Sequence, residues 1–186
     1  KMIFEVKKTY EKMGIEVVEI SLPHTKYMVP VYYIIQPAEV SSNLGRFDGI
    51  RYGNNRNSFG EEAKRRIMLG SYILSAGYYD EYYDKAMKVR TKIINDFDEA
   101  FKTVDAIISP VSPTPPFKLG ENTKDPLKMY LEDVYTTTAN LVGIPSLALP
   151  STFSTSGLPI GFQIMGPRFS EHALFELGRK YQQCIK

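Results

Sequence analysis

The chain has 186 residues, of which 43% are apolar, and this allows a globular domain with a hydrophobic core. Its 23 basic and 21 acidic residues leave a net charge of +2, too small to indicate unaided binding to nucleic acid. A single cysteine, Cys184, excludes an intrachain disulfide and a cysteine metal cluster, and it fits a reducing cytoplasm.

Apolar residues recur at helical spacing in six segments, most of them bounded by a glycine or a proline. Pro30 and Pro126 fit first helical turns, because their missing N–H groups are not needed there. Pro37 predicts a kink or a restart inside the second helix, and Asp80 can cap the fourth. In chain order, the predicted helices cover residues 4–13, 30–44, 61–74, 80–104, 126–141 and 171–185.

Runs of apolar, often β-branched residues predict four short strands. The polar, glycine-punctuated segment 45–60 is a predicted loop, and the four prolines of residues 110–116 exclude a helix or an inner strand there. Four short strands are too few for a self-contained doubly wound sheet, so we expect further strands outside this chain. The predicted strands cover residues 15–20, 106–108, 146–149 and 160–165.

The beginning of the chain and its histidines add two further expectations. Lys1 and Glu5 lie where a signal peptide would need apolar residues, and the methionine is second rather than first. We therefore expect the chain to start inside a longer protein. His24 and His172 are far apart and lack ligand spacing, so we expect no zinc site. No apolar run approaches the roughly 18 residues that a membrane-spanning helix needs.

Three polar residues stand out because apolar residues surround them. Arg66 precedes Ile67-Met68-Leu69, and a guanidinium there can bind a carboxylate through two hydrogen bonds. Asp133 offers the fixed carboxylate that an α-ammonium group requires, and Tyr32 could cover a small ligand. An arginine and an aspartate are the minimal pair that recognises a free amino acid. On spacing alone, however, ordinary ion pairs explain these residues better. No G-x-S-x-G motif or glycine-rich phosphate loop accompanies them.

Longer motifs resemble one family. The segment Tyr32–Gly53 (YYIIQPAEVSSNLGRFDGIRYG) closely resembles the A subunits of glutamyl-tRNA(Gln)/aspartyl-tRNA(Asn) amidotransferases, which are amidase-signature proteins. Other amidase-signature enzymes share the prolines and the Gly157-Leu158-Pro159 turn, but not this stretch. The match covers nearly the whole chain and continues in residues 59–70, 75–80, 109–114, 129–133 and 157–161.

The resemblance implies a fold and an activity. Residues 1–186 would be the C-terminal portion of a single amidase-signature domain, an α/β/α sandwich with a mixed central sheet. The implied activity is that of a glutaminase-type amidotransferase, in which a Ser-Ser-Lys set attacks the side-chain amide of glutamine and releases ammonia. Implied partners are the B and C subunits and, through the B subunit, tRNA. ATP and Mg²⁺ are used by the B subunit, and no cofactor is implied for this one.

The resemblance also implies roles for the three polar residues. An arginine matching Arg66 holds the α-carboxylate of glutamine, an aspartate matching Asp133 holds its α-ammonium group, and a tyrosine matching Tyr32 packs at the bound substrate. The Gly/Ser-rich segment with the catalytic serines and the lysine is absent from this chain. The connection at residues 53–59 is also shorter than in the family, which indicates a gap or a shortened loop.

Three functions therefore stay open. The first is the ammonia-donating subunit that converts Glu-tRNA(Gln) to Gln-tRNA(Gln), with this chain supplying the glutamine-binding residues. The second is a non-catalytic assembly or interaction module derived from an amidase. The third is another amidase-signature hydrolase that acts on a different amide. The sequence does not distinguish Gln-tRNA from Asn-tRNA as the product.

Overall fold

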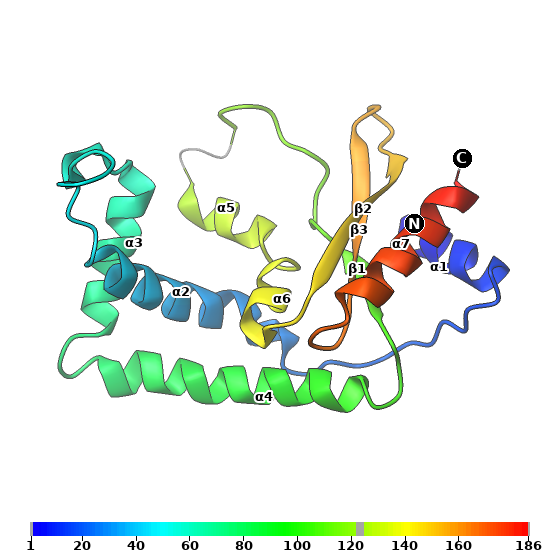
Figure 1. Ribbon diagram of the computed structural model, residues 1–186, viewed down its shortest axis with the longest axis horizontal. Coiled ribbons are helices and arrows are strands. Elements are labelled where there is room, and N and C mark those ends of the chain that lie inside the picture. The colour runs from blue at the N-terminus through cyan, green and yellow to red at the C-terminus, as the bar shows by residue number, and fades with distance from the viewer. Residues whose placement is uncertain (1, 122–124, 186) are drawn as a thin grey trace. The chain divides into compact units, whose positions relative to one another are not determined.

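The computed structural model describes residues 2–121 and 125–185, which fall into two compact units. Unit 1 comprises Lys1–Val29 and Ile93–Lys186, and unit 2 comprises Pro30–Lys92. The boundaries between the units fall within two helices, α2 (Met28–Leu44) and α4 (Lys85–Ala100). Both helices and strands are present (Figure 1), which confirms the predicted α/β class.

A three-stranded antiparallel sheet forms the centre of unit 1 (Figure 1). Ile107 of the first strand and Ser146 of the second both lie opposite Met165 of the third. The first strand lies at an edge of the sheet, where Pro110 is tolerated although its nitrogen cannot donate a hydrogen bond to a neighbouring strand. The strands are β1 (Ile107–Pro110), β2 (Ser146–Phe153) and β3 (Pro159–Met165), and β3 lies between the other two.

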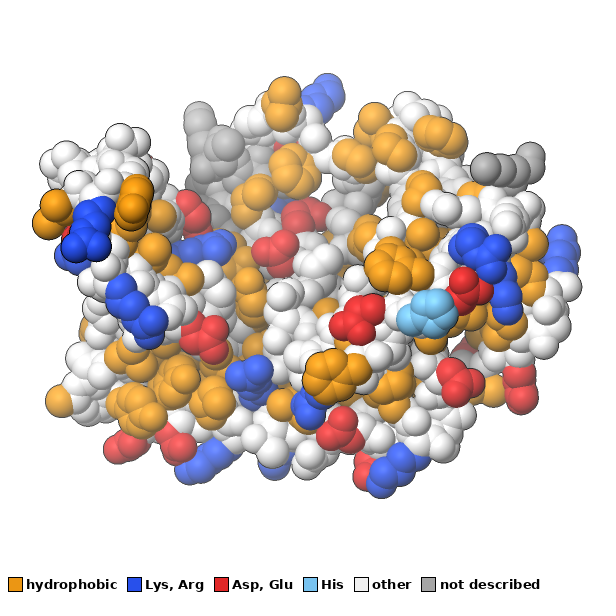
Figure 2. Space-filling model, viewed as in Figure 1, with side chains coloured by type: hydrophobic (Ala, Val, Ile, Leu, Met, Phe, Trp, Pro, Cys, Tyr) orange, Lys and Arg blue, Asp and Glu red, His pale blue; other side chains and the backbone are white. Residues whose placement is uncertain are grey.

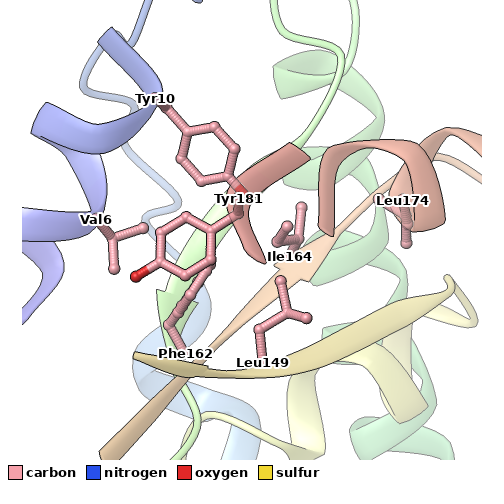
Figure 3. Packing of buried hydrophobic residues seen from close by; sticks show 7 residues of the cluster. All are labelled: Val6, Tyr10, Leu149, Phe162, Ile164, Leu174 and Tyr181. Atoms are coloured by element: carbon pink, nitrogen blue, oxygen red, sulfur yellow. The ribbon is translucent and has the colours of Figure 1, made fainter. Parts of the chain in front are cut away.

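Two helices, α1 (Met2–Lys12) and α7 (Glu171–Cys184), pack on one face of this sheet. Figure 3 shows how their side chains meet those of β2 and β3. The ring centroids of Tyr10, Phe162 and Tyr181 lie 4.8–6.5 Å from one another. Full burial of one such large side chain stabilises a fold by roughly 1.5–3 kcal/mol. The cluster consists of Val6, Tyr10, Leu149, Phe162, Ile164, Leu174 and Tyr181.

The other side of the sheet faces the segment that contains two short helices, α5 (Pro126–Glu132) and α6 (Thr137–Val142) (Figure 1). Successive side chains of a strand alternate between its faces, so Gln163 points away from the core that Phe162 and Ile164 join. Gly143 ends α6 with a left-handed φ of 74°.

Unit 2 contains most of α2, all of α3 (Glu61–Ile73) and the first part of α4. Helix α2 continues through Pro37 without the predicted restart. A π-helical turn, Tyr79–Asp84, precedes α4, and its N-cap residue is Tyr78, whose side chain makes no capping hydrogen bond. The predicted capping role of Asp80 is therefore wrong, because this residue lies inside the turn rather than ahead of it.

The predicted loop at residues 45–60 is present, and its ends are held together within unit 2. The guanidinium of Arg56 donates hydrogen bonds of 2.8 and 2.9 Å to the carbonyl oxygens of Phe47 and Gly45. The rings of Phe47 and Phe59 lie 5.3 Å apart. A short 3₁₀ helix, Arg56–Ser58, forms inside the loop and is capped by the side chain of Asn55. The short connection at 53–59 thus lies in a closed loop.

Residues 15–20 do not form the predicted strand. Among the residues that the structure describes, ladder pairs join only β1, β2 and β3. Ile15 and Val17 pack against the core of unit 1, whereas Val18 is exposed. Side chains of this segment thus alternate between the core and solvent, as in an extended chain, but its backbone pairs with none of the three strands.

No helix within the described ranges combines the length and the apolar character needed to cross a membrane.

Candidate functional site

A cleft of about 330 Å³ in unit 1 contains one of the predicted site residues, Asp133. Three parts of the chain form its walls: the proline-rich segment after β1, the end of α5 with the turn that follows, and the start of β3. Asp133 is the acidic group that the sequence singles out there, and Glu132 beside it also lines the cleft. The remaining lining residues are Val111, Ser112, Thr114, Pro115, Pro116, Phe117, Thr136, Pro159, Ile160 and Gly161.

Asp133 lies where α5 ends, not inside a continuous helix over 126–141 as the sequence predicts. The side chain of Asp125 caps the start of α5, and Asp133 is its C-terminal capping residue. The carbonyl oxygen of Asp133 accepts hydrogen bonds from the backbone N–H groups of Thr136 and Thr137, at 3.1 and 3.0 Å. This turn separates α5 from α6 and leaves Asp133 half-buried on the wall of the cleft.

Glu132, the last residue of α5, is hydrogen-bonded to the proline-rich segment that forms one wall of the cleft. Its Oε2 atom accepts hydrogen bonds from the hydroxyls of Ser112 and Thr114, at 3.1 and 2.8 Å. Prolines fix φ but leave the chain without N–H donors, so such a segment needs side-chain contacts to hold its position. Glu132 therefore shapes the cleft, while the neighbouring Asp133 carboxylate can accept hydrogen bonds from an ammonium group.

The buried amide of Gln163 is a residue that the sequence reasoning missed. Its Nε2 atom donates hydrogen bonds of 2.9 Å to the hydroxyl of Ser109 and to the carbonyl oxygen of Tyr135. The hydroxyl of Ser146 donates a 2.9 Å bond to its Oε1 atom. The available signal was a single amide between Phe162 and Ile164 in an otherwise apolar strand, since a buried amide needs partners.

Arg66 and Tyr32, the other two predicted site residues, both lie in unit 2. The Nε of Arg66 donates a 2.9 Å hydrogen bond to Glu62, and its guanidinium lies 6.0 Å from the ring centroid of Tyr33. The rings of Tyr33 and Tyr32 meet edge to face at 5.2 Å. Within unit 2, the structure thus brings the guanidinium to a tyrosine pair, and Tyr33 is the member whose ring it approaches.

The guanidinium of Arg66 is partly enclosed. Its side chain is 29% exposed, whereas that of the neighbouring Arg65 is 50% exposed. Both arginines pair with the same carboxylate, Glu62. An exposed ion pair contributes little to stability, so the partial enclosure against an aromatic face is what distinguishes Arg66.

Other tyrosines of unit 2 form an exposed cluster. The rings of Tyr72 and Tyr78 lie 4.2 Å apart, and a hydrogen bond to Tyr78 raises the pKa of Tyr72 to about 12.

On the face of the molecule shown in Figure 2, acidic and basic side chains are interspersed, in keeping with the net charge of +2. Within the described ranges, no group of three His, Cys, Asp or Glu residues could hold a metal ion.

Comparisons of sequence place these features among known proteins. A family model described as Amidase matches residues 1–175. Over 191 residues, this chain is 52% identical to the A subunit of the glutamyl-tRNA(Gln) amidotransferase of Desulfatibacillum aliphaticivorans, and the match covers 95% of this chain and 39% of that protein. It is 54% identical to the first A subunit of the same amidotransferase in Clostridium acetobutylicum, over 96% of this chain and 40% of that protein. The chain thus spans about 40% of the length of these curated relatives.

Solved structures agree with the sequence comparison. The A subunit of the glutamyl-tRNA(Gln) amidotransferase from Thermotoga maritima has a TM-score of 0.74 at 45% identity, over 95% of this chain and 36% of that one. The allophanate hydrolase of Kluyveromyces lactis has a TM-score of 0.78 at 22% identity, over 97% of this chain and 28% of that one. The second likeness shows the fold alone. The two structures together confirm the amidase-signature fold that the sequence resemblance implies.

Proposed function

This chain belongs to the amidase family, and from that membership we propose that it is the glutamine-binding part of a tRNA-dependent amidotransferase. The protein that carries it hydrolyses the side-chain amide of glutamine, and the ammonia converts Glu-tRNA(Gln) to Gln-tRNA(Gln). The observation that supports this is the 52% and 54% identity, over almost the whole chain, to two subunits named for that amidotransferase. Because the chain spans about 40% of those relatives, the activity is proposed for the intact protein.

In this proposal, Arg66 binds the α-carboxylate of glutamine. A guanidinium presents parallel N–H donors that fit a carboxylate. The contact with Glu62 and the ring of Tyr33 restrict its side chain before the ligand arrives, which reduces the entropy lost on binding. Tyr32, whose ring packs against Tyr33, is proposed to pack at the bound substrate.

Asp133 is proposed to bind the α-ammonium group. Its support is its place on the wall of the cleft in unit 1, at the end of a helix whose following turn is hydrogen-bonded. A charged hydrogen bond between carboxylate and ammonium is stronger than one between neutral groups. Asp133 and Arg66 would together distinguish an amino acid from a simple amide, because each recognises one of its two charged groups.

The proposal assigns no catalytic residue, metal or nucleotide to this chain. The Ser-Ser-Lys set is proposed to lie in another part of the intact protein, and the B and C subunits are its proposed partners. ATP and Mg²⁺ are proposed to be used by the B subunit, through which tRNA is bound. The role of this chain is then to bind and orient glutamine for the attack.

Ammonia release by the intact protein tests the proposal. With glutamine as substrate we expect ammonia, and with Glu-tRNA(Gln), ATP and Mg²⁺ in the presence of the partner subunits we expect Gln-tRNA(Gln). Ammonia from other primary amides but not from glutamine would favour a different amidase-signature hydrolase. No ammonia from any amide would favour the non-catalytic module.

A further inference from the structure

We propose that Gln163 is a positioning residue for Asp133, and that it controls recognition of the α-ammonium group by holding the turn that carries this carboxylate. The inference rests on the proposed function, because it assumes that Asp133 meets the substrate. It adds a residue on a different element, β3, whose side chain does not line the cleft.

The first support is the completeness of the hydrogen bonding around this amide. Gln163 is 3% exposed, and both ends of its amide have partners on three separate segments. Nε2 donates to Ser109 on β1 and to the carbonyl oxygen of Tyr135, and Oε1 accepts from Ser146 on β2. A third acceptor, the carbonyl oxygen of Pro110, lies 3.3 Å from Nε2. A buried amide with all its partners in place is held in one orientation.

The Tyr135 carbonyl oxygen, to which the amide of Gln163 donates, is close to Asp133 along the chain. Tyr135 lies two residues after Asp133, inside the turn between α5 and α6. The carbonyl oxygen of Asp133 accepts the N–H groups of Thr136 and Thr137, so the turn is closed on itself. Fixing the Tyr135 carbonyl to the sheet therefore fixes the backbone of Asp133 as well.

The strand that carries Gln163 also lines the cleft. Pro159, Ile160 and Gly161 line it, two to four residues before Gln163 on the same strand. A Cβ at Gly161 would lie only 2.7 Å from the carbonyl oxygen of Leu149, so β3 fits closely against β2. The amide of Gln163 thus connects the turn that carries Asp133 to the strand that forms another part of the cleft wall.

The test replaces Gln163 by methionine in the intact protein. Methionine has nearly the same volume but cannot bind the Tyr135 carbonyl oxygen, so the core stays filled while the turn loses its anchor. The readout is kcat/KM for glutamine and for glutaramate, the same amide without the α-ammonium group. We expect Q163M to lower kcat/KM for glutamine roughly tenfold, mainly through KM, because a small displacement of a positioning group has a large effect. We expect less than a twofold change with glutaramate.

Two further variants keep the test independent of folding. Ser151→Ala removes a 3.0 Å contact between Ser151 of β2 and Tyr181 of α7, outside the lining of the cleft, and should leave the ratio between the two substrates unchanged. Gln163→Asn keeps an amide but is one methylene shorter, so it also loses the reach to the Tyr135 carbonyl oxygen. If the methionine variant does not fold, the asparagine variant should show the change in the ratio that is expected of Q163M.

Equal losses with both substrates, or an unchanged KM for glutamine in a folded variant, would overturn the inference. That outcome differs from failure of the proposed function, in which the unmodified protein releases no ammonia from glutamine. A ratio that changes in Q163M as it does in Asp133→Asn is the result that supports the assignment.

Discussion

Gly70 of α3 lies directly against the backbone of Pro37 in α2. A Cβ at position 70 would overlap the Pro37 carbonyl oxygen and would lie 2.7 Å from the hydroxyl of Ser41. Arg66 precedes Gly70 by about one helical turn, and Tyr33 precedes Pro37 by about one turn. The close approach of the two helices therefore brings the guanidinium of Arg66 to the ring of Tyr33.

We predict that Gly70→Ala destabilises the protein by about 1–3 kcal/mol, because the methyl group overlaps backbone that cannot rotate away. The thermal unfolding midpoint of the intact protein measures the effect. Gly60→Ala is the matched control, since a Cβ at position 60 meets nothing within 4 Å and the residue only caps α3. Equal midpoints for the two variants would show that the helices are not packed as described.

Loss of the Arg66 side chain should weaken glutamine use strongly. Truncating one partner of a charged hydrogen-bonded pair costs roughly 2–5 kcal/mol, which corresponds to a loss of about 30-fold to several thousandfold. We expect Arg66→Ala to show this loss in kcat/KM for glutamine. Arg65→Ala should change kcat/KM less than twofold, although Arg65 also pairs with Glu62. Similar losses in both variants would point to the shared ion pair rather than to a ligand.

Asp133→Asn should raise the KM for glutamine with a smaller effect on kcat. Asparagine keeps the shape of the side chain but removes the negative charge that attracts an ammonium group. The unfolding midpoint should change little, because the side chain lies on the wall of a cleft rather than in the core. Steady-state kinetics compared with a variant of an exposed aspartate, Asp98→Asn, provide the check, and an unchanged KM would exclude the proposed role.

The core of unit 1 should make stability fall in alkaline solution. Burial, and then repulsion from an ionised Tyr181, raises the pKa of Tyr10 above its usual value. In the unfolded chain this phenol ionises near pH 10. Above that pH the unfolded state binds fewer protons than the folded state, so the free energy of unfolding decreases, and below it this contribution is fully present.

We therefore expect Tyr10→Phe to gain stability relative to the unmodified protein as the pH rises above 10. Urea unfolding at several pH values between 8 and 11 measures the difference, which should stay constant at the lower values. The slope is at most about 1.4 kcal/mol per pH unit for one proton. Tyr52→Phe, at a residue 85% exposed, is the control and should show no such trend.

Amphipathic helices were the part of the fold that the sequence predicted well. The ends of α1, α3 and α7 agree with the predicted ranges to within about two residues, because apolar spacing and a flanking glycine are local signals. The predicted strands at 146–149 and 160–165 are also present as parts of β2 and β3, and the one at 106–108 overlaps β1 from Ile107. Local composition alone sufficed there because each strand carries its own apolar run.

Features that depend on distant partners could not be predicted in this way. Residues 15–20 have the composition of a strand, but a strand also needs a neighbour with free backbone groups. The break after Glu132 depends on backbone bonds that close the turn at Asp133. Gln163 is recognisable as important only once Tyr135 is placed opposite it. The contacts that support Asp133 and Gln163 could not be read from the sequence, because they join residues far apart along the chain or depend on the backbone of the turn.

The most direct test of the central claim compares three amides in three forms of the intact protein. The amides are glutamine, glutaramate, which lacks the α-ammonium group, and 4-aminobutanamide, which lacks the α-carboxylate. The unmodified protein should prefer glutamine to both analogues. Arg66→Ala should lose only the preference over 4-aminobutanamide, and Asp133→Asn should lose only the preference over glutaramate. If each variant loses activity in equal proportion with all three amides, neither residue binds the group assigned to it and the account is wrong.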